Sequence, residues 1–271
     1  MPVEWQVVGQ SVRGATHERN GLPNQDAIYW LPASGRGASA VVAVADGHGS
    51  ARYSRSHIGA ALAVERSVQL MDEFLNSQAE GDNLSLIKHA AEEWLPRALV
   101  RNWSSAIDDH LRTDPLSPEE QYGGESSIAY GTTLLIAAVT ERFICYLQLG
   151  DGDILTVNDR GEVSRPLAKD ERLLGNETTS LCATDAWRDF RINFQPLTQS
   201  HPALVLLSTD GYPNSFRDEP GFFKVGSDLL QMIEEHGLAR VAADLAGWLR
   251  DATHAGSGDD VTLGIISSLA K

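Results

Sequence analysis

The sequence is poor in cysteine, in basic residues and in long apolar runs, and each shortage excludes a class of protein. Among 271 residues there are only two cysteines, Cys145 and Cys182, which excludes a disulfide-rich scaffold and a CxxC motif. Lys and Arg number 22 against 37 Asp and Glu, and the resulting net charge of −15 would repel nucleic acid and anionic membranes. No stretch approaches the roughly 18 apolar residues of a membrane-spanning helix, and the first residues do not resemble a signal peptide. We therefore expect a reduced, cytoplasmic protein with no nucleic-acid or membrane partner.

The order of strand-like and helix-like segments predicts a single α+β domain over residues 1–271. Segments rich in β-branched residues alternate with segments whose apolar residues recur at helical spacing. Helices are expected over Ala51–Ser77 and over 84–111 as one helix, and a further helical block is expected from Phe222 to Thr253. Thr16–Pro23 is expected to be a loop. Strand pairs separated by helix pairs favour two sheets packed face to face with helices covering the outside.

Aspartates recur where apolar segments end, and each lies beside a glycine. Asp46 follows a valine-rich run, Asp151 and Asp210 follow two further strand-like segments, and Asp259 precedes the last one. Four independent Asp-Gly turns are the simpler alternative. However, carboxylates gathered at one edge of a sandwich repel one another, and a bound cation usually offsets that repulsion. Oxygen ligands without a His or Cys cluster favour Mg²⁺ or Mn²⁺ over Zn²⁺.

Short motifs occur along the chain in the order found in one family. They are NQDA at Asn24–Ala27, ADGHG at Ala45–Gly49, GTT at Gly131–Thr133, LGDGD at Leu149–Asp153, STDG at Ser208–Gly211 and GDDVT at Gly258–Thr262. Together they resemble the PPM family, the PP2C-type metal-dependent protein serine/threonine phosphatases, and GNETTSL at Gly175–Leu181 is similar to a bacterial branch of it. The resemblance implies a four-layer α/β/β/α sandwich, in which two antiparallel sheets are flanked by helices and carry a binuclear site at one end.

The resemblance also implies the ligands of two Mn²⁺ or Mg²⁺ ions. Asp46 would bridge both ions, and the Gly47 carbonyl would bind one of them. The further acidic positions that match the family are Asp26, Asp151, Asp210 and Asp259. Of these, Asp210 and Asp259 would be the remaining ligands of the second ion. Asp26 would act mainly through metal-bound water. Asp151, together with Asp210, would hold a weaker third ion.

The implied reaction is hydrolysis of phosphoserine or phosphothreonine in a protein by a water activated at the two ions. His48 would act as the general acid on the departing oxygen. The substrate would be a target of a Ser/Thr kinase or the kinase itself, and residues 167–188 would form a flap beside the site. A catalytically degenerate phosphoprotein-binding protein and a cation-binding structural protein are the alternatives.

Some positions depart from the family pattern. Gln25 replaces a glutamate, and Gly21 stands where many members have a phosphate-binding arginine. Arg13 or Arg19 is the favoured substitute for that arginine, and either could equally be a solvated loop charge. Asp153 and Asn214 also differ from common versions of their motifs, and we expect them to tune the site rather than to abolish it.

Overall fold

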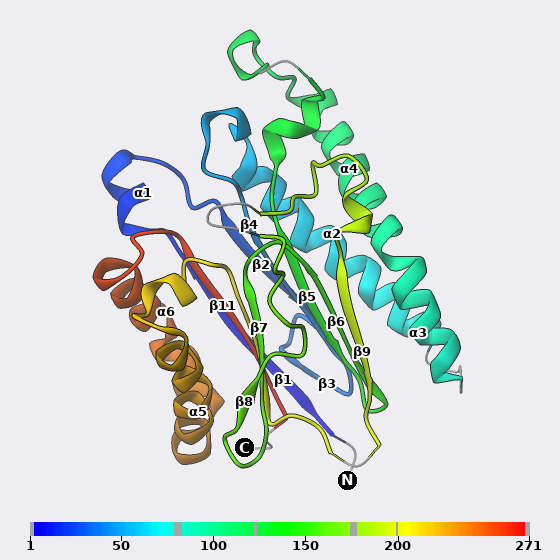
Figure 1. Ribbon diagram of the computed structural model, residues 1–271, viewed down its shortest axis with the longest axis vertical. Coiled ribbons are helices and arrows are strands. Elements are labelled where there is room, and N and C mark those ends of the chain that lie inside the picture. Colours follow the sequence, from blue (N-terminus) through cyan, green and yellow to red (C-terminus); the bar gives the residue numbers. More distant parts are fainter. Residues whose placement is uncertain (1–2, 79–82, 122–123, 174–177, 199, 269–271) are drawn as a thin grey trace.

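Two antiparallel sheets form the centre of the computed structural model, which describes residues 3–78, 83–121, 124–173, 178–198 and 200–268 (Figure 1). One sheet has the strand order β3 (Arg36–Gly37), β1 (Trp5–Val12), β11 (Val261–Ser267), β10 (Leu204–Ser208), β7 (Asp153–Val157) and β8 (Val163–Ser164). The other has the order β2 (Asp26–Leu31), β4 (Ala40–Asp46), β5 (Leu134–Val139), β6 (Phe143–Leu149) and β9 (Arg191–Pro196). All neighbouring strands run antiparallel.

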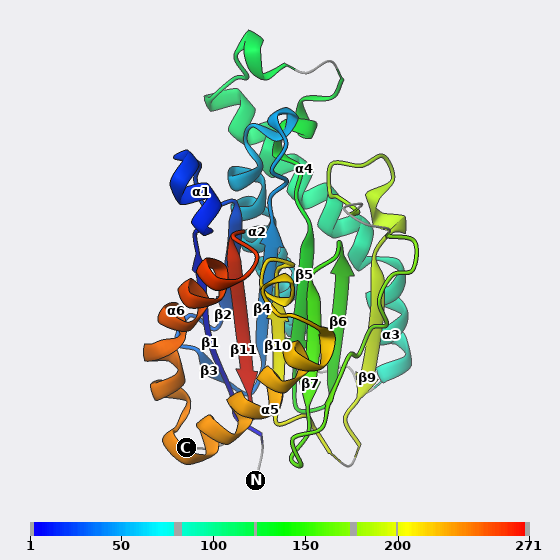
Figure 2. The same ribbon diagram turned by 60° about the vertical axis from the view of Figure 1, so that its left-hand side comes forward.

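Helices cover both outer faces of this pair of sheets (Figure 2). The β2–β9 sheet is covered by α2 (Ser56–Ser77), α3 (Leu84–Glu93) and α4 (Leu95–Thr113), and the β3–β8 sheet by α5 (Glu219–His236) and α6 (Leu238–Ala255). The short helix α1 (Ala15–Asn20) contacts α6. This confirms the predicted α+β sandwich. Among the helices that the structure describes, none combines the length and apolar composition that a membrane crossing requires.

Side-chain alternation along the strands divides the apolar core into three layers. In β4 the odd-numbered residues 41–45 pack beneath α2 and α4, whereas the even-numbered residues 40–44 lie between the two sheets. In β11 the odd-numbered residues 261–265 pack beneath α5 and α6. Because successive side chains of a strand point to opposite faces, each sheet buries both of its faces. This explains the nearly continuous apolar segments of the sequence.

Two predictions about helices were wrong. The expected helix over 84–111 breaks at Trp94, because Pro96 lacks an N–H group and its ring excludes the preceding turn of a continuous helix. The expected loop Thr16–Pro23 overlaps α1, which at 6 residues is too short to show a clear helical period. The helical block expected from Phe222 to Thr253 is formed by α5 and α6, which are separated at Gly237, whose φ of 83° favours glycine.

Candidate functional site

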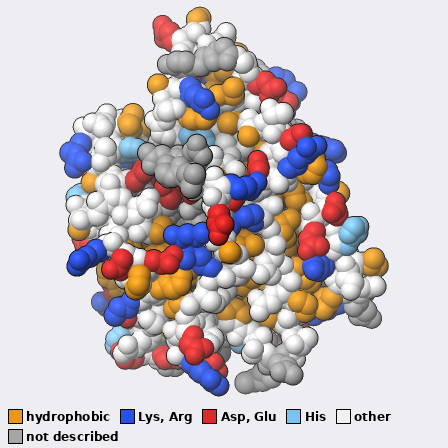
Figure 3. All heavy atoms as spheres, in the orientation of Figure 1, with side chains coloured by type: hydrophobic (Ala, Val, Ile, Leu, Met, Phe, Trp, Pro, Cys, Tyr) orange, Lys and Arg blue, Asp and Glu red, His pale blue; other side chains and the backbone are white. Residues whose placement is uncertain are grey.

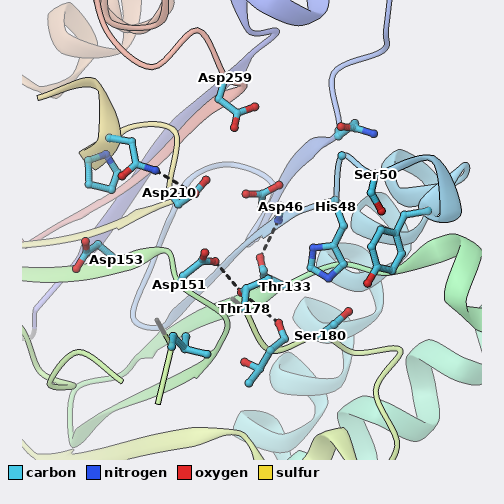
Figure 4. A pocket seen from close by; sticks show the side chains of 18 of the residues that line it. Asp46, His48, Ser50, Thr133, Asp151, Asp153, Thr178, Ser180, Asp210 and Asp259 are labelled. Carbon is cyan, nitrogen blue, oxygen red and sulfur yellow. Dashed lines mark hydrogen bonds between the residues drawn. The ribbon is translucent and has the colours of Figure 1, made fainter. Parts of the chain in front are cut away.

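A cavity of about 1190 Å³ lies at the end of the sandwich where β4 and β10 end (Figure 4). The predicted site residues that line it are Asp46, Gly47, His48, Asp151, Asp210 and Asp259. They come from both sheets and from segments more than 200 residues apart, and in Figure 4 the four carboxylates surround one space. Asp26 is buried at the edge of this group, opposite Asp46 in the register of β2 and β4.

Strand alternation explains why Asp26 and Asp46 share this position. The even-numbered residues of β2 and β4 face the space between the sheets, and both aspartates continue that series at the end of their strands. Asp26 Oδ2 accepts hydrogen bonds from Thr209 Oγ1 at 2.6 Å and from Thr262 Oγ1 at 2.8 Å. Because both threonines belong to the opposite sheet, Asp26 links the two sheets directly beneath the cavity.

The GTT motif fixes the backbone on either side of Asp46. Thr133 Oγ1 accepts a hydrogen bond from the Asp46 N–H at 2.9 Å, and the Asp46 carbonyl accepts hydrogen bonds from Thr133 N and Thr132 Oγ1, each at 2.9 Å. The next residue must be glycine, since a Cβ on Gly47 would lie 2.7 Å from the Ser56 carbonyl oxygen. The GTT motif and the glycine of the ADGHG motif therefore hold the Asp46 carboxylate in one place.

Two of the remaining acids are placed by the β3–β8 sheet. Asp210 follows β10, and its Oδ2 accepts a hydrogen bond from Asn214 Nδ2 at 3.1 Å, which gives Asn214 a supporting role. Asp259 precedes β11 and is 53% exposed. The same sheet carries Asp153, which is buried and ion-paired with Arg165 rather than directed at the other acids.

Asp151 lies in the turn between β6 and β7 and contacts the predicted flap. Its Oδ1 accepts a hydrogen bond from Thr178 Oγ1 at 2.8 Å (Figure 4). The flap prediction, 167–188, and the GNETTSL motif both include residues 174–177, which lie outside the described residues. Within the described part, Lys169, Arg172 and Ser180 line the cavity.

The electrostatics of the acid cluster favour a bound cation. Burial raises the pKa of Asp46 well above its usual value, and the charges of Asp26 and Asp210 raise it further. Burial likewise raises the pKa of Asp210 to about 6, with additional repulsion from Asp151 and Asp259. Carboxylates that are desolvated and face one another cost free energy unless protons or cations neutralise them. Hard oxygen donors in this arrangement fit divalent ions such as Mg²⁺ or Mn²⁺.

His48 lies beside the acids, with its ring packed edge-on against Tyr53 at 4.7 Å between centroids. Its backbone N–H donates to the Gly131 carbonyl at 3.1 Å. Burial, together with the positive charge of Arg52, lowers the pKa of His48 to about 4. The imidazole is therefore neutral at pH 7, and an anionic phosphate beside it would favour the protonated form.

The cations near the cavity differ from the ones that the sequence suggested. Arg13 Nη1 donates to the Leu22 carbonyl at 3.3 Å and Arg19 Nη2 to Thr16 Oγ1 at 3.0 Å, and among the described residues neither arginine lines the cavity. Lys169 and Arg172 do line it, and Arg172 is paired with Asp170 and Asp189. Figure 3 shows basic and acidic side chains side by side across the middle of this face. Sequence reasoning missed both residues because they lie in the segment predicted as a flap, where no motif marks them.

Comparisons with known proteins agree with this geometry. A family profile described as Protein phosphatase 2C matches residues 13–250. Curated protein sequences give no match. Similar solved structures include the catalytic domain of the serine/threonine protein phosphatase PstP in complex with two manganese ions, at 18% identity, 98% coverage of each chain and a TM-score of 0.59.

Two further structures have the same fold. Stp1 from Staphylococcus aureus, a serine/threonine phosphatase, is 16% identical over 98% of this chain and 95% of that chain, with a TM-score of 0.60. PppA of Pseudomonas aeruginosa, described as a regulatory component of its T6SS, is 14% identical over 97% of each chain, also with a TM-score of 0.60. At identities of 14–18%, these structures show only that the fold is shared. The family profile matches residues 13–250, which is most of the sequence, and therefore shows the family. The chain belongs to the protein phosphatase 2C family.

Proposed function

We propose that the protein hydrolyses phosphoserine and phosphothreonine in other proteins and that it needs divalent metal ions to do so. One observation carries the proposal: Asp46, Asp210 and Asp259 converge from two sheets on one cavity with His48 beside them. The main charges acting on Asp46 and Asp210 are those of other aspartates, so bound divalent cations would relieve their mutual repulsion. A degenerate, purely binding protein would not need to keep these residues together.

The metal ligands that we propose are those that the sequence predicted. Asp46 and the Gly47 carbonyl, with Asp210 and Asp259, would hold two Mn²⁺ or Mg²⁺ ions, and Asp151 with Asp210 would hold a weaker third. Such ions, when bound, supply an activated water and neutralise charge on the phosphoryl oxygens. Asp26 would orient the ligands through the bridge that it makes to Thr209 and Thr262. The presence of two manganese ions in the PstP structure supports this stoichiometry.

The proposed substrate is a protein phosphorylated by a Ser/Thr kinase, or that kinase itself. We propose that 1–271 acts as one domain and that 167–188 is the flap that meets the substrate. Lys169 and Arg172 line the cavity from this segment, so they are better placed than Arg13 or Arg19 to attract an anionic phosphopeptide. The role of Arg13 or Arg19 in phosphate binding stays a prediction.

The direct test is release of inorganic phosphate from a phosphoserine peptide. We expect turnover with added Mn²⁺ and no turnover in the presence of excess chelator, because the attacking water is activated only on the metal. The one Cys-x5-Arg spacing in the chain, Cys182 to Arg188, does not offer an alternative nucleophile, since burial raises the pKa of the Cys182 thiol and Arg188 is paired with Asp185. Peptide binding measured by fluorescence anisotropy serves as the parallel readout. Binding without phosphate release would support the degenerate alternative, and turnover in stripped protein under strict chelation would contradict the metal requirement.

A second test concerns His48. If His48 protonates the leaving oxygen, His48→Gln should slow hydrolysis of a phosphoserine peptide by about 10²–10⁴-fold, since a serine alkoxide is a poor leaving group. Hydrolysis of p-nitrophenyl phosphate should slow much less, because its phenolate leaves without a proton. Both rates are measured at saturating Mn²⁺. Equal losses on both substrates, together with weaker Mn²⁺ binding, would show that His48 only supports the Asp46 turn.

A further inference from the structure

His17 is a cavity-lining residue that no sequence motif indicated. It lies on α1, which is attached to the C-terminal part of the chain by hydrogen bonds from Thr16 N to the Gly258 carbonyl at 2.8 Å and from Ala15 N to Thr253 Oγ1 at 3.1 Å. These contacts bring the His17 side chain, 12% exposed, next to Asp259 and Asp260. The separation of 243 residues from Asp260 explains why the sequence alone could not reveal the contact.

Asp260 holds the His17 ring in one orientation. The Asp260 side chain is only 2% exposed, its Oδ1 accepts from Gly14 N at 2.6 Å, and its Oδ2 accepts from Gln25 N at 2.6 Å. The same Oδ2 lies 2.9 Å from His17 Nδ1. Because a carboxylate that already accepts two amide hydrogen bonds acts as an acceptor here as well, His17 Nδ1 carries the hydrogen. In the neutral ring the lone pair is then on Nε2.

The free nitrogen is directed at Asp259. His17 Nε2 lies 3.9 Å from Asp259 Oδ1, too far for a hydrogen bond. Ligand bonds to small divalent ions are about 2.1 Å long, so two ligands of one ion lie at most about 4.2 Å apart. One ligand atom from each of His17, Asp259 and Asp260 falls within 4.8 Å of the others. The half-exposed Asp259 side chain has room to adjust, so the pair fits a shared cation.

We propose that His17 is a nitrogen ligand of the divalent ion held by Asp259, and that Asp260 is its positioning residue. The proposal rests on the metal-dependent function inferred above, and it adds a donor that the oxygen-only ligand set does not contain. A carboxylate that accepts from the distal nitrogen of a ligating histidine fixes its tautomer and raises its basicity. Since Mg²⁺ prefers oxygen donors and imidazole suits first-row transition metals, His17 would contribute less to binding of Mg²⁺ than to binding of a transition-metal ion at this site.

Pulsed electron paramagnetic resonance of the Mn²⁺-loaded protein tests this directly, because a coordinated imidazole gives a ¹⁴N coupling to the ion. We expect the coupling in the wild type, its loss in His17→Ala and its retention in His48→Gln, the matched control for the other histidine of the cavity. Isothermal titration with Mn²⁺ should show affinity about 10- to 100-fold lower in His17→Ala, with a smaller loss for Mg²⁺. The unfolding temperature of the metal-free variant checks that it folds.

The other outcomes are distinguishable. Mn²⁺ binding without a ¹⁴N coupling in the wild type would overturn the His17 ligand and leave the proposed function intact. Unchanged Mn²⁺ affinity in His17→Ala with weaker inhibition by inorganic phosphate would also overturn it and would make His17 a phosphate contact. Failure of the wild type to bind Mn²⁺ would overturn this inference and the proposed function together.

Discussion

Replacing Asp46 by Asn is expected to abolish turnover without unfolding the protein. The amide keeps the shape of the carboxylate but cannot bridge two cations, so several kcal/mol of transition-state stabilisation should be lost. At about 1.4 kcal/mol per tenfold, this corresponds to a fall in kcat of at least about 10²-fold on a phosphoserine peptide. Near-normal rates with an unchanged Mn²⁺ requirement would show that Asp46 does not bridge the ions.

The same variant should be more stable than the wild type when metal is absent. Burial and the charges of Asp26 and Asp210 disfavour the Asp46 carboxylate, and the substitution removes this cost. For a chain of this size each kcal/mol gained raises the unfolding temperature by about 2–4 °C. Asp153→Asn is the matched control, since Asp153 is also a buried acid in a strand but is paired with Arg165. Its substitution should lower the unfolding temperature.

The stabilisation conferred by Mn²⁺ is expected to grow steeply between pH 5 and pH 7. The pKa of Asp210 is raised from 3.8 to about 6, so in the metal-free protein its contribution to stability is present at low pH and is lost as the pH rises through about 6. Below pH 6 metal binding must displace the Asp210 proton, and the raised pKa of Asp46 acts in the same direction. From Asp210 alone, the apparent Mn²⁺ affinity should therefore rise about fivefold between pH 5 and pH 6.

The measurement is the difference in unfolding temperature with and without Mn²⁺ at each pH. The difference is needed because His48, whose pKa is lowered to about 4, acts in the opposite direction by stabilising the folded protein as the pH rises. In Asp210→Asn the pH dependence of Mn²⁺ affinity should be weaker. A Mn²⁺ effect that does not change with pH would show that the acids near the cavity are already ionised without metal.

Local sequence patterns were sufficient for the two-sheet fold and for the positions of the strand-end acids. Asp46, Asp210 and Asp259 each adjoin an apolar strand, so their places at the sheet ends could be expected once the strands were recognised. Which face each acid occupies depends on side-chain alternation, which requires exact strand bounds. The break at Trp94 could also have been expected, because Pro96 is visible in the sequence.

Contacts between distant segments could not be predicted in this way. The bridge from Asp26 to Thr209 and Thr262 crosses between sheets, and the His17–Asp260 contact depends on how α1 docks on α6. Arg165 looks like an ordinary surface charge in the sequence, yet it neutralises Asp153. Such pairs are fixed by tertiary packing, and no local propensity encodes them.

The pairing of β1 with β11 has a consequence for how the protein could be joined to other chains. Gln6 is opposite Ser267, whereas Val12 is opposite Val261 beside Asp260, so the outer ends of the pair lie about 20 Å along the strands from the cavity. A domain joined to the chain at Gln6 or Ser267 would therefore start at the end of these strands that lies away from the cavity. The proximity of Gln6 and Ser267 also makes a short linker between the ends feasible, with new termini opened in a surface loop elsewhere.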